Sequence, residues 1–236
     1  MVRIDGLAAS AAGLMMAALP SPRAIAAEQR PVVVELFTSQ GCSTCPQAED
    51  VINDFARNRK DLLPLAFHVD YWNRQGWTDP FSSPEATERQ RVYASRATDP
   101  TLFTPQMIID GASAVVGSDP QAIDQAIDAA SDDVVTAASV SVKTGPGGLV
   151  VAVGPGTGRA DIVLIGYDRS HTTAVGRGEN TGRTLTELNV VRSVQNIGEW
   201  TGAAQSIRRP APAGQLVAVL LAAPDGRIIG AAAPHH

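Results

Sequence analysis

A strand-like apolar run that leads through a turn into a Cys-x-x-C pair constrains the fold of this chain more than any other feature. Residues 32–37 (VVVELF) are almost uninterrupted in apolar side chains, a pattern typical of a strand covered on both faces. After Cys42 and Cys45, apolar residues recur at the spacing of one helix face, at Ala48, Val51, Ile52 and Phe55. The sequence therefore predicts a strand, a turn and a helix, with Cys42 at the helix N-terminus.

The predicted position of Cys42 bears on its reactivity. Unpaired amide groups and the positive end of a helix dipole favour a thiolate, and such surroundings lower a cysteine pKa from about 8.5 to roughly 3.5–7.5. Cys45 would lie one turn further along, close enough to resolve a mixed disulfide on Cys42. We therefore predict that Cys42 is an accessible nucleophile and that Cys45 is a shielded resolving thiol.

The cysteine count limits the covalent options. The chain has only two cysteines, so any disulfide within it joins Cys42 to Cys45. One Cys-x-x-C is a poor zinc site, and a bridge across so short a loop stabilises little, so redox chemistry is favoured. We predict no metal and no cofactor. The alternatives are a copper-type binding or delivery protein that uses the same thiols, and a non-catalytic binding module.

Residues 1–27 are typical of a secretory signal peptide. Arg3 precedes an apolar run over 7–19, and Ala24-Ile25-Ala26 is a small-residue cleavage site. The run is shorter than the about 20 residues that span a bilayer, which disfavours a membrane anchor. Without Arg3, Arg23 and Asp5, the 19 basic and 24 acidic residues become 17 and 23, which disfavours nucleic acid as a partner. We expect a periplasmic or secreted protein.

The chain after the first helix continues with alternating strand and helix patterns. The apolar run at 62–69 follows that helix, and this order predicts a parallel crossover. Residues 70–83 are rich in aromatic side chains and turn formers, which predicts a loop. This loop should lie at the same sheet edge as the cysteines, and Trp72 and Trp77 within it are candidates for substrate contact. His68 is read as a core residue rather than a catalyst. Ser83-Pro84-Glu85 predicts a helix start.

Residues 104–111 (TPQMIIDG) predict a strand that begins at a proline and ends in an Asp-Gly hairpin turn into 112–116. Asp119-Pro120 then predicts another helix. From Ala138 onward, short apolar or alternating runs are separated by Gly-rich turns, which predicts a small antiparallel sandwich or sheet. We expect this half to be a separate supporting unit without catalytic groups, with its loop at 177–183 as an internal brace. The competing hypothesis is that this loop reaches the cysteines.

Five segments resemble one bacterial protein family, namely VELFTSQGCSTCP (34–46), AFHVDYW (66–72), GWTDPFSSP (76–84), TPQMIIDG (104–111) and RGENTGRTL (177–185). The sequence resembles the DUF1223 family of exported, uncharacterised thioredoxin-like proteins. The resemblance implies an α/β fold, with a thioredoxin-like domain at 28–135 and a C-terminal antiparallel β-rich, sandwich-like domain at 136–236.

The resemblance also implies roles for individual residues. Thr104–Pro105 would be the cis-proline loop that faces the cysteine pair and binds substrate in the thioredoxin superfamily. Thioredoxins carry a buried acid six residues before the first cysteine, and Glu35 lies seven residues before Cys42. A proton relay at Glu35 and a carboxylate satisfied by some other partner are equal alternatives.

The resulting hypothesis is an exported thiol-disulfide oxidoreductase that uses the Cys42-Ser43-Thr44-Cys45 motif, with Cys42, Cys45 and Glu35 as catalytic residues. Its partners would be proteins or small molecules that bear thiols or disulfides, and a redox partner that recycles the pair.

Overall fold

The computed structural model describes residues 30–132, 137–145 and 147–233. The predicted signal peptide and the predicted domain boundary at 135–136 lie outside the described residues. Within the described ranges, no helix is long and apolar enough to cross a membrane.

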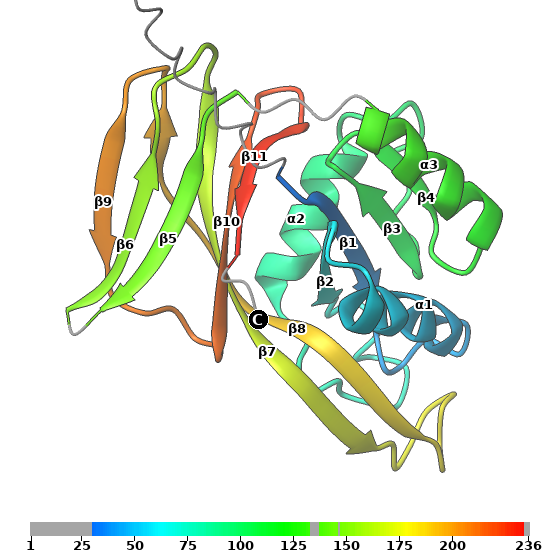
Figure 1. Cartoon of the computed structure of the whole chain (residues 1–236). Helices are drawn as coiled ribbons and strands as arrows, with labels where there is room; N and C mark the ends of the chain where they lie inside the picture. The colour runs from blue at the N-terminus through cyan, green and yellow to red at the C-terminus, as the bar shows by residue number, and fades with distance from the viewer. Residues whose placement is uncertain (1–29, 133–136, 146, 234–236) are drawn as a thin grey trace, which may run out of the picture.

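The described part of the chain forms three helices and eleven strands (Figure 1). In chain order these are β1 (Val32–Thr38), α1 (Cys45–Asn58), β2 (Leu62–His68), α2 (Pro84–Ala94), β3 (Gln106–Ile109), β4 (Ser113–Val116), α3 (Pro120–Asp132), β5 (Val140–Gly145), β6 (Gly148–Val153), β7 (Ala160–Ala174), β8 (Thr184–Trp200), β9 (Gln205–Arg209), β10 (Leu216–Ala222) and β11 (Ile228–Ala232).

The first half confirms the predicted strand, helix and strand order. β1 and β2 pair in parallel along their full length, and α1 connects them. β3 pairs antiparallel with β1, and β4 closes that edge of the sheet. Asp110 and Gly111 have φ angles of 52° and 71°, the left-handed values that a tight hairpin turn of this kind requires. The predicted Asp-Gly hairpin is therefore confirmed.

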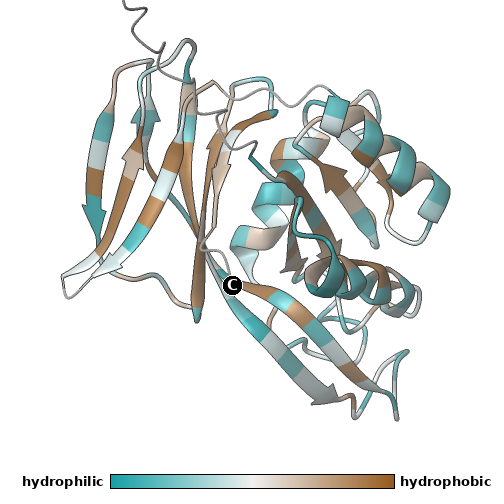
Figure 2. Cartoon of the chain, viewed as in Figure 1, coloured by the Kyte–Doolittle hydropathy of each residue, from teal (hydrophilic) through white to brown (hydrophobic). Residues whose placement is uncertain are grey.

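Helices α2 and α3 begin where the sequence predicts caps. Pro84 is the first residue of α2, and the Ser83 hydroxyl accepts a hydrogen bond from the backbone N–H of Ala86 at 3.1 Å. The Asp119 carboxylate accepts from the N–H of Ala122 at the start of α3. α1 and α3 pack on one face of the first four strands, whereas Tyr93 of α2 packs on the other. In Figure 2 the ribbon is largely brown along the central strands, and teal segments are frequent along the helices.

The strands of both halves form one sheet, which departs from the expectation of a separate C-terminal unit. Its order is β11-β10-β7-β8-β2-β1-β3-β4, and a second sheet, β5-β6-β9, covers part of it. The two halves join where β2 and β8 run parallel, with Ala66 opposite Val190. The protein is thus a mixed α/β structure with a large, mostly antiparallel sheet.

The hydrophobic core contains residues from both halves of the chain. Side chains alternate along β7, so that Ile162 and Leu164 pack toward the second sheet with Trp200. Val163 and Ile165 point the other way, into a cluster that contains residues of β1, β2 and α2. A strand buried on both faces needs no polar alternation, which accounts for the continuous apolar run ADIVLIGY.

Candidate functional site

The cysteine pair forms a disulfide at the start of α1. Cys45 is the first helical residue and Thr44 precedes it as the cap, so the prediction that placed Cys42 at the helix N-terminus is shifted by three residues. The carbonyl oxygen of Cys42 accepts a hydrogen bond from the N–H of Cys45 at 3.2 Å. Both cysteines are only 1% exposed, so the prediction of an accessible Cys42 is wrong for this oxidised state.

The loop at 177–183, which joins β7 to β8, covers the disulfide. The side-chain amide of Asn180 donates to the carbonyl oxygens of Gln40 at 2.9 Å and Cys42 at 2.8 Å. The Glu179 carboxylate accepts from the N–H of Ser43 at 3.1 Å. This loop therefore reaches the cysteines, as the competing hypothesis held. It does so through Asn180 and Glu179, while Arg183 donates to the amide oxygen of Asn180 and orients that side chain.

Gln40 anchors the turn before Cys42. Its backbone N–H donates to Asp79 at 2.9 Å, its amide nitrogen donates to Glu187 at 2.7 Å, and its amide oxygen accepts from the indole N–H of Trp77 at 3.1 Å. The sequence predicts that Trp77 contacts substrate, and in this structure its indole N–H braces residues 39–45, called here the disulfide loop. Because Gln40 is 1% exposed, each of these bonds replaces one to water.

Trp72 links the disulfide loop to the Thr104–Pro105 segment. The Thr104–Pro105 peptide bond is cis, as predicted, and the indole N–H of Trp72 donates to the Thr104 hydroxyl at 2.8 Å. A side chain added at Gly41 would approach the Cβ of Trp72 to 3.3 Å, so Trp72 also lies directly against the turn that leads to Cys42. Trp72 thus connects the Thr104–Pro105 segment to the turn before Cys42, and substrate contact by Trp72, Thr104 and Pro105 stays a prediction.

Glu35 is satisfied by partners away from the cysteines. Its carboxylate accepts from Arg89 at 2.7 Å and from the Tyr93 hydroxyl, both on α2. Successive residues of a strand face opposite sides of the sheet, and Glu35 lies on the side of α2, not of α1 and Cys45. Burial alone would lower the pKa of Arg89, but the Glu35 carboxylate raises it above its usual value. Of the two hypotheses for Glu35, the structure supports the second.

A buried polar cluster lies below the disulfide loop and contains Glu49, His68, Asp79 and Glu187. Nδ1 of His68 is 2.7 Å from the Asp79 carboxylate, and its Nε2 is 4.0 Å from Oε1 of Glu187. Glu49 follows Cys45 by four residues and so shares its face of α1. Burial raises the pKa of Glu49 to about 7, against the opposing effect of His68. Burial alone would lower the pKa of His68, but Asp79, Glu187 and Glu49 raise it to about 9.

The sequence reasoning named His68 but missed its acidic partners. The position of Glu49, on the inner face of α1 one turn after Cys45, was a usable signal. Glu187 carried no local signal, because it meets α1 only through the pairing of β8 with β2. His68, Glu49 and Glu187 are a donor set that could hold a metal ion.

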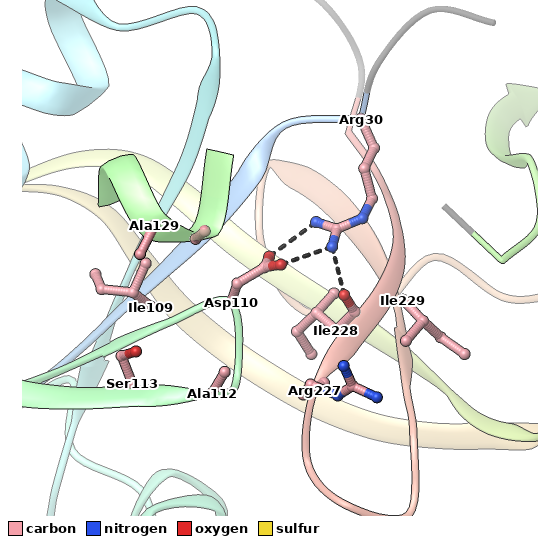
Figure 3. Close-up of a pocket in the computed structure, with 10 residues that line it drawn as sticks. Arg30, Ile109, Asp110, Ala112, Ser113, Ala129, Arg227, Ile228 and Ile229 are labelled. Atoms are coloured by element: carbon pink, nitrogen blue, oxygen red, sulfur yellow. Dashed lines mark hydrogen bonds and ion pairs between the residues drawn. The ribbon is translucent and has the colours of Figure 1, made fainter. Parts of the chain in front are cut away.

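A separate pocket lies where Arg30 meets the β3–β4 turn and β11 (Figure 3). The Arg30 guanidinium donates to both Asp110 carboxylate oxygens, at 2.8 and 2.6 Å, and to the carbonyl oxygen of Ile228. Among the described residues that line the pocket, none belongs to the disulfide loop. The pocket therefore lies at the contact between the two halves, apart from the candidate site.

The fold and the site define a mixed α/β protein with a buried Cys-x-x-C disulfide beside a polar cluster. The chain belongs to the DUF1223 family, described as a protein of unknown function, whose model matches residues 33–221. This confirms the family resemblance of the sequence.

Two solved structures are similar. The crystal structure of protein AGR_C_4864 from Agrobacterium tumefaciens is 33% identical, with a TM-score of 0.76 over 89% of this chain and 99% of that one. HBP35 of Porphyromonas gingivalis is 12% identical, with a TM-score of 0.59 over 87% of this chain and 75% of that one, and shares the fold alone. No curated protein matches the sequence.

Proposed function

We propose that this protein is an exported thiol-disulfide oxidoreductase with a thioredoxin-like redox half, which exchanges its Cys42–Cys45 disulfide with cysteines of other proteins. The observation that carries the proposal is the placement of the disulfide, with Cys45 as the first residue of α1. The positive end of the helix dipole stabilises a thiolate there when the disulfide opens. Export is proposed from the pattern of residues 1–27.

The proposed exchange has two steps. A thiolate of the partner attacks Sγ of Cys42, forms a mixed disulfide and displaces Cys45 as a thiolate. A second thiolate of the partner then attacks the partner's own sulfur in the mixed disulfide and releases Cys42. The partner leaves with one new disulfide, and both cysteines of the pair are reduced. The same steps in reverse reduce a partner disulfide, and the relative reduction potentials set the direction.

The loop at 177–183 would control access to the reaction. Cys42 is 1% exposed under this loop, so exchange requires Asn180 and Glu179 to release their hydrogen bonds to the disulfide loop. Trp72 and Thr104, both half-buried, would then border the opened site and contact the substrate segment beside Cys42. Ser43 and Thr44 are already exposed, which favours approach from that side.

The test uses an unfolded protein that contains cysteines, in its disulfide-bonded form for trapping and in its reduced form for disulfide transfer. The Cys42 thiolate of Cys45→Ala should attack the partner's disulfide and accumulate a mixed disulfide, because no resolving thiol remains to release it, and Cys42→Ala should not. The wild type should transfer its disulfide faster than free glutathione disulfide does at equal concentration. Exchange no faster than glutathione, or trapping by Cys42→Ala in place of Cys45→Ala, would contradict the proposal.

A further inference from the structure

We propose that Glu49, His68 and Glu187 form a binding site for one divalent first-row transition-metal ion, separate from the cysteine pair. The inference goes beyond the proposed redox function and departs from the sequence-based expectation of no metal.

The three side chains come from three elements that meet inside the protein. Glu49 is on α1, His68 ends β2 and Glu187 is on β8. One ligand atom from each lies within 4.8 Å of the other two, and the residues are 5%, 1% and 1% exposed. Asn53, four residues after Glu49, fixes the contact, because it donates to the carbonyl oxygen of Thr186 and accepts from the N–H of Leu188, on either side of Glu187.

Several atoms of the cluster that could bind a metal ion have no hydrogen-bond partner. Both carboxylate oxygens of Glu49 and Nε2 of His68 are buried with no partner in hydrogen-bond geometry. The same is true of the hydroxyl of Thr38, the residue opposite His68 in the β1–β2 register, although it lies close enough to Glu49 to lower the pKa of that carboxylate. Buried polar groups almost always have a partner, so each of these unpartnered atoms is unfavourable in the folded protein. A cation bound between Glu49 and His68 would satisfy these atoms at once.

Residues around the three proposed ligands fix the orientation of two of them, His68 and Glu187. Asp79 lies 2.7 Å from Nδ1 of His68, which fixes the ring and leaves Nε2 directed at the cluster. Gln40 donates to Oε2 of Glu187 and leaves Oε1, 4.0 Å from Nε2 of His68. That separation is too long for a hydrogen bond. Two ligands of one tetrahedral zinc ion lie about 3.3 Å apart, so binding needs a contraction of about 0.7 Å for this pair.

Charge favours the same conclusion. Three carboxylates, those of Glu49, Asp79 and Glu187, surround a single imidazole away from water. A divalent cation would offset this excess of negative charge. One imidazole with carboxylates suits Zn²⁺, Mn²⁺ and Co²⁺ rather than Cu(I), which prefers thiolate ligands.

The experiment measures binding of Zn²⁺, Mn²⁺ and Co²⁺ to the purified, oxidised protein after removal of metal with EDTA. Equilibrium dialysis should show one ion of at least one of the three per chain. Glu49→Gln, Glu187→Gln and His68→Gln should each weaken binding at least about tenfold, and Asp79→Asn by roughly 10–100-fold. Asp50→Asn, the exposed neighbour of Glu49 on the same helix, should bind as the wild type does.

Two further measurements separate ligation from folding and from the thiols. Without metal, Glu49→Gln should unfold at the wild-type temperature or above, because it removes a buried charge, but the metal-induced rise should be absent. A double variant with Cys42→Ser and Cys45→Ser should still bind the ion with the affinity of the wild type. No saturable binding of any of the three ions, binding that survives the three ligand variants, or binding lost in the double cysteine variant would overturn the proposal.

Discussion

Asn180 donates a hydrogen bond of 2.8 Å to the carbonyl oxygen of Cys42, which lies 138 residues earlier in the chain. Asn180 is 1% exposed and its amide also holds the carbonyl oxygen of Gln40. The β7–β8 connection therefore fixes the backbone on which the disulfide stands. The contact joins the backbone at Cys42 to the second half of the chain.

Asn180→Ala should expose the disulfide. The change removes the partner of two carbonyl oxygens, those of Gln40 and Cys42, and should destabilise the fold by about 1–3 kcal/mol. We expect the disulfide to be reduced by dithiothreitol several-fold faster than in the wild type, measured by thiol release over time. Arg177→Ala, an exposed change in the same loop, is the control and should leave the rate unchanged. An unchanged rate in Asn180→Ala would mean that the loop does not limit access.

Arg89→Met should be costly, because it leaves the fully buried carboxylate of Glu35 without its ion pair. Removing one partner of a buried pair typically costs about 3–5 kcal/mol, and we expect a loss in that range by urea unfolding. A double variant with Glu35→Leu and Arg89→Met should recover part of that loss. If the single change costs less than about 1 kcal/mol, the pair contributes little to stability.

Glu35→Gln should leave disulfide exchange unchanged in the folded protein. The side chain lies on the α2 side of the sheet, away from Cys45, so it is not placed to transfer a proton to the thiols. The measurement is the exchange rate with glutathione as a function of pH, which should follow the wild-type curve. A curve displaced along the pH axis would restore Glu35 as a proton relay.

Gly111→Ala should disrupt the contact between the β3–β4 turn and the turn before β11. The φ of Gly111 is 71°, which costs an L-residue about 1–2 kcal/mol, and the new Cβ would lie 2.1 Å from the carbonyl oxygen of Gly226. We expect a loss of more than 2 kcal/mol in the free energy of unfolding. Gly145→Ala is the matched control, because nothing lies within 4 Å of its new Cβ. Equal stability of the two variants would contradict the close approach of the turns.

Residues 28–135 should not fold as an isolated fragment. In the whole chain, Phe37 and Phe67 pack in one cluster with Ile165 of β7 and Leu220 of β10, and the fragment would expose that face. We expect no cooperative thermal transition for the fragment by circular dichroism and a single transition for the whole chain. A cooperative transition in the fragment would show that the first half is an independent domain after all.

Local features of the fold could be predicted from the sequence because their causes are local. The apolar spacing from Ala48 to Phe55 specifies one helix face, Ser83-Pro84 specifies a helix start, and Asp110-Gly111 specifies a tight turn, since each depends on backbone and side-chain preferences within a few residues. The cis bond at Pro105 was predicted from the family resemblance instead. The sequence showed that the second half is β-rich, but it did not show which strands pair with one another.

The candidate site also combines features that the sequence predicts locally with features that only the tertiary structure creates. The sequence by itself determined that Cys42 and Cys45 are the only residues able to form a disulfide and that a strand and a helix flank them. Only the tertiary structure decided that Cys42 is buried under Asn180, that Glu35 faces α2, and that Glu49, His68 and Glu187 meet. The physical reason is that β8 pairs with β2 through backbone hydrogen bonds. These bonds depend little on side-chain identity, so the sequence of β8 does not indicate its partner strand. Which distant strand is chosen depends on how the buried faces of the whole chain fit together.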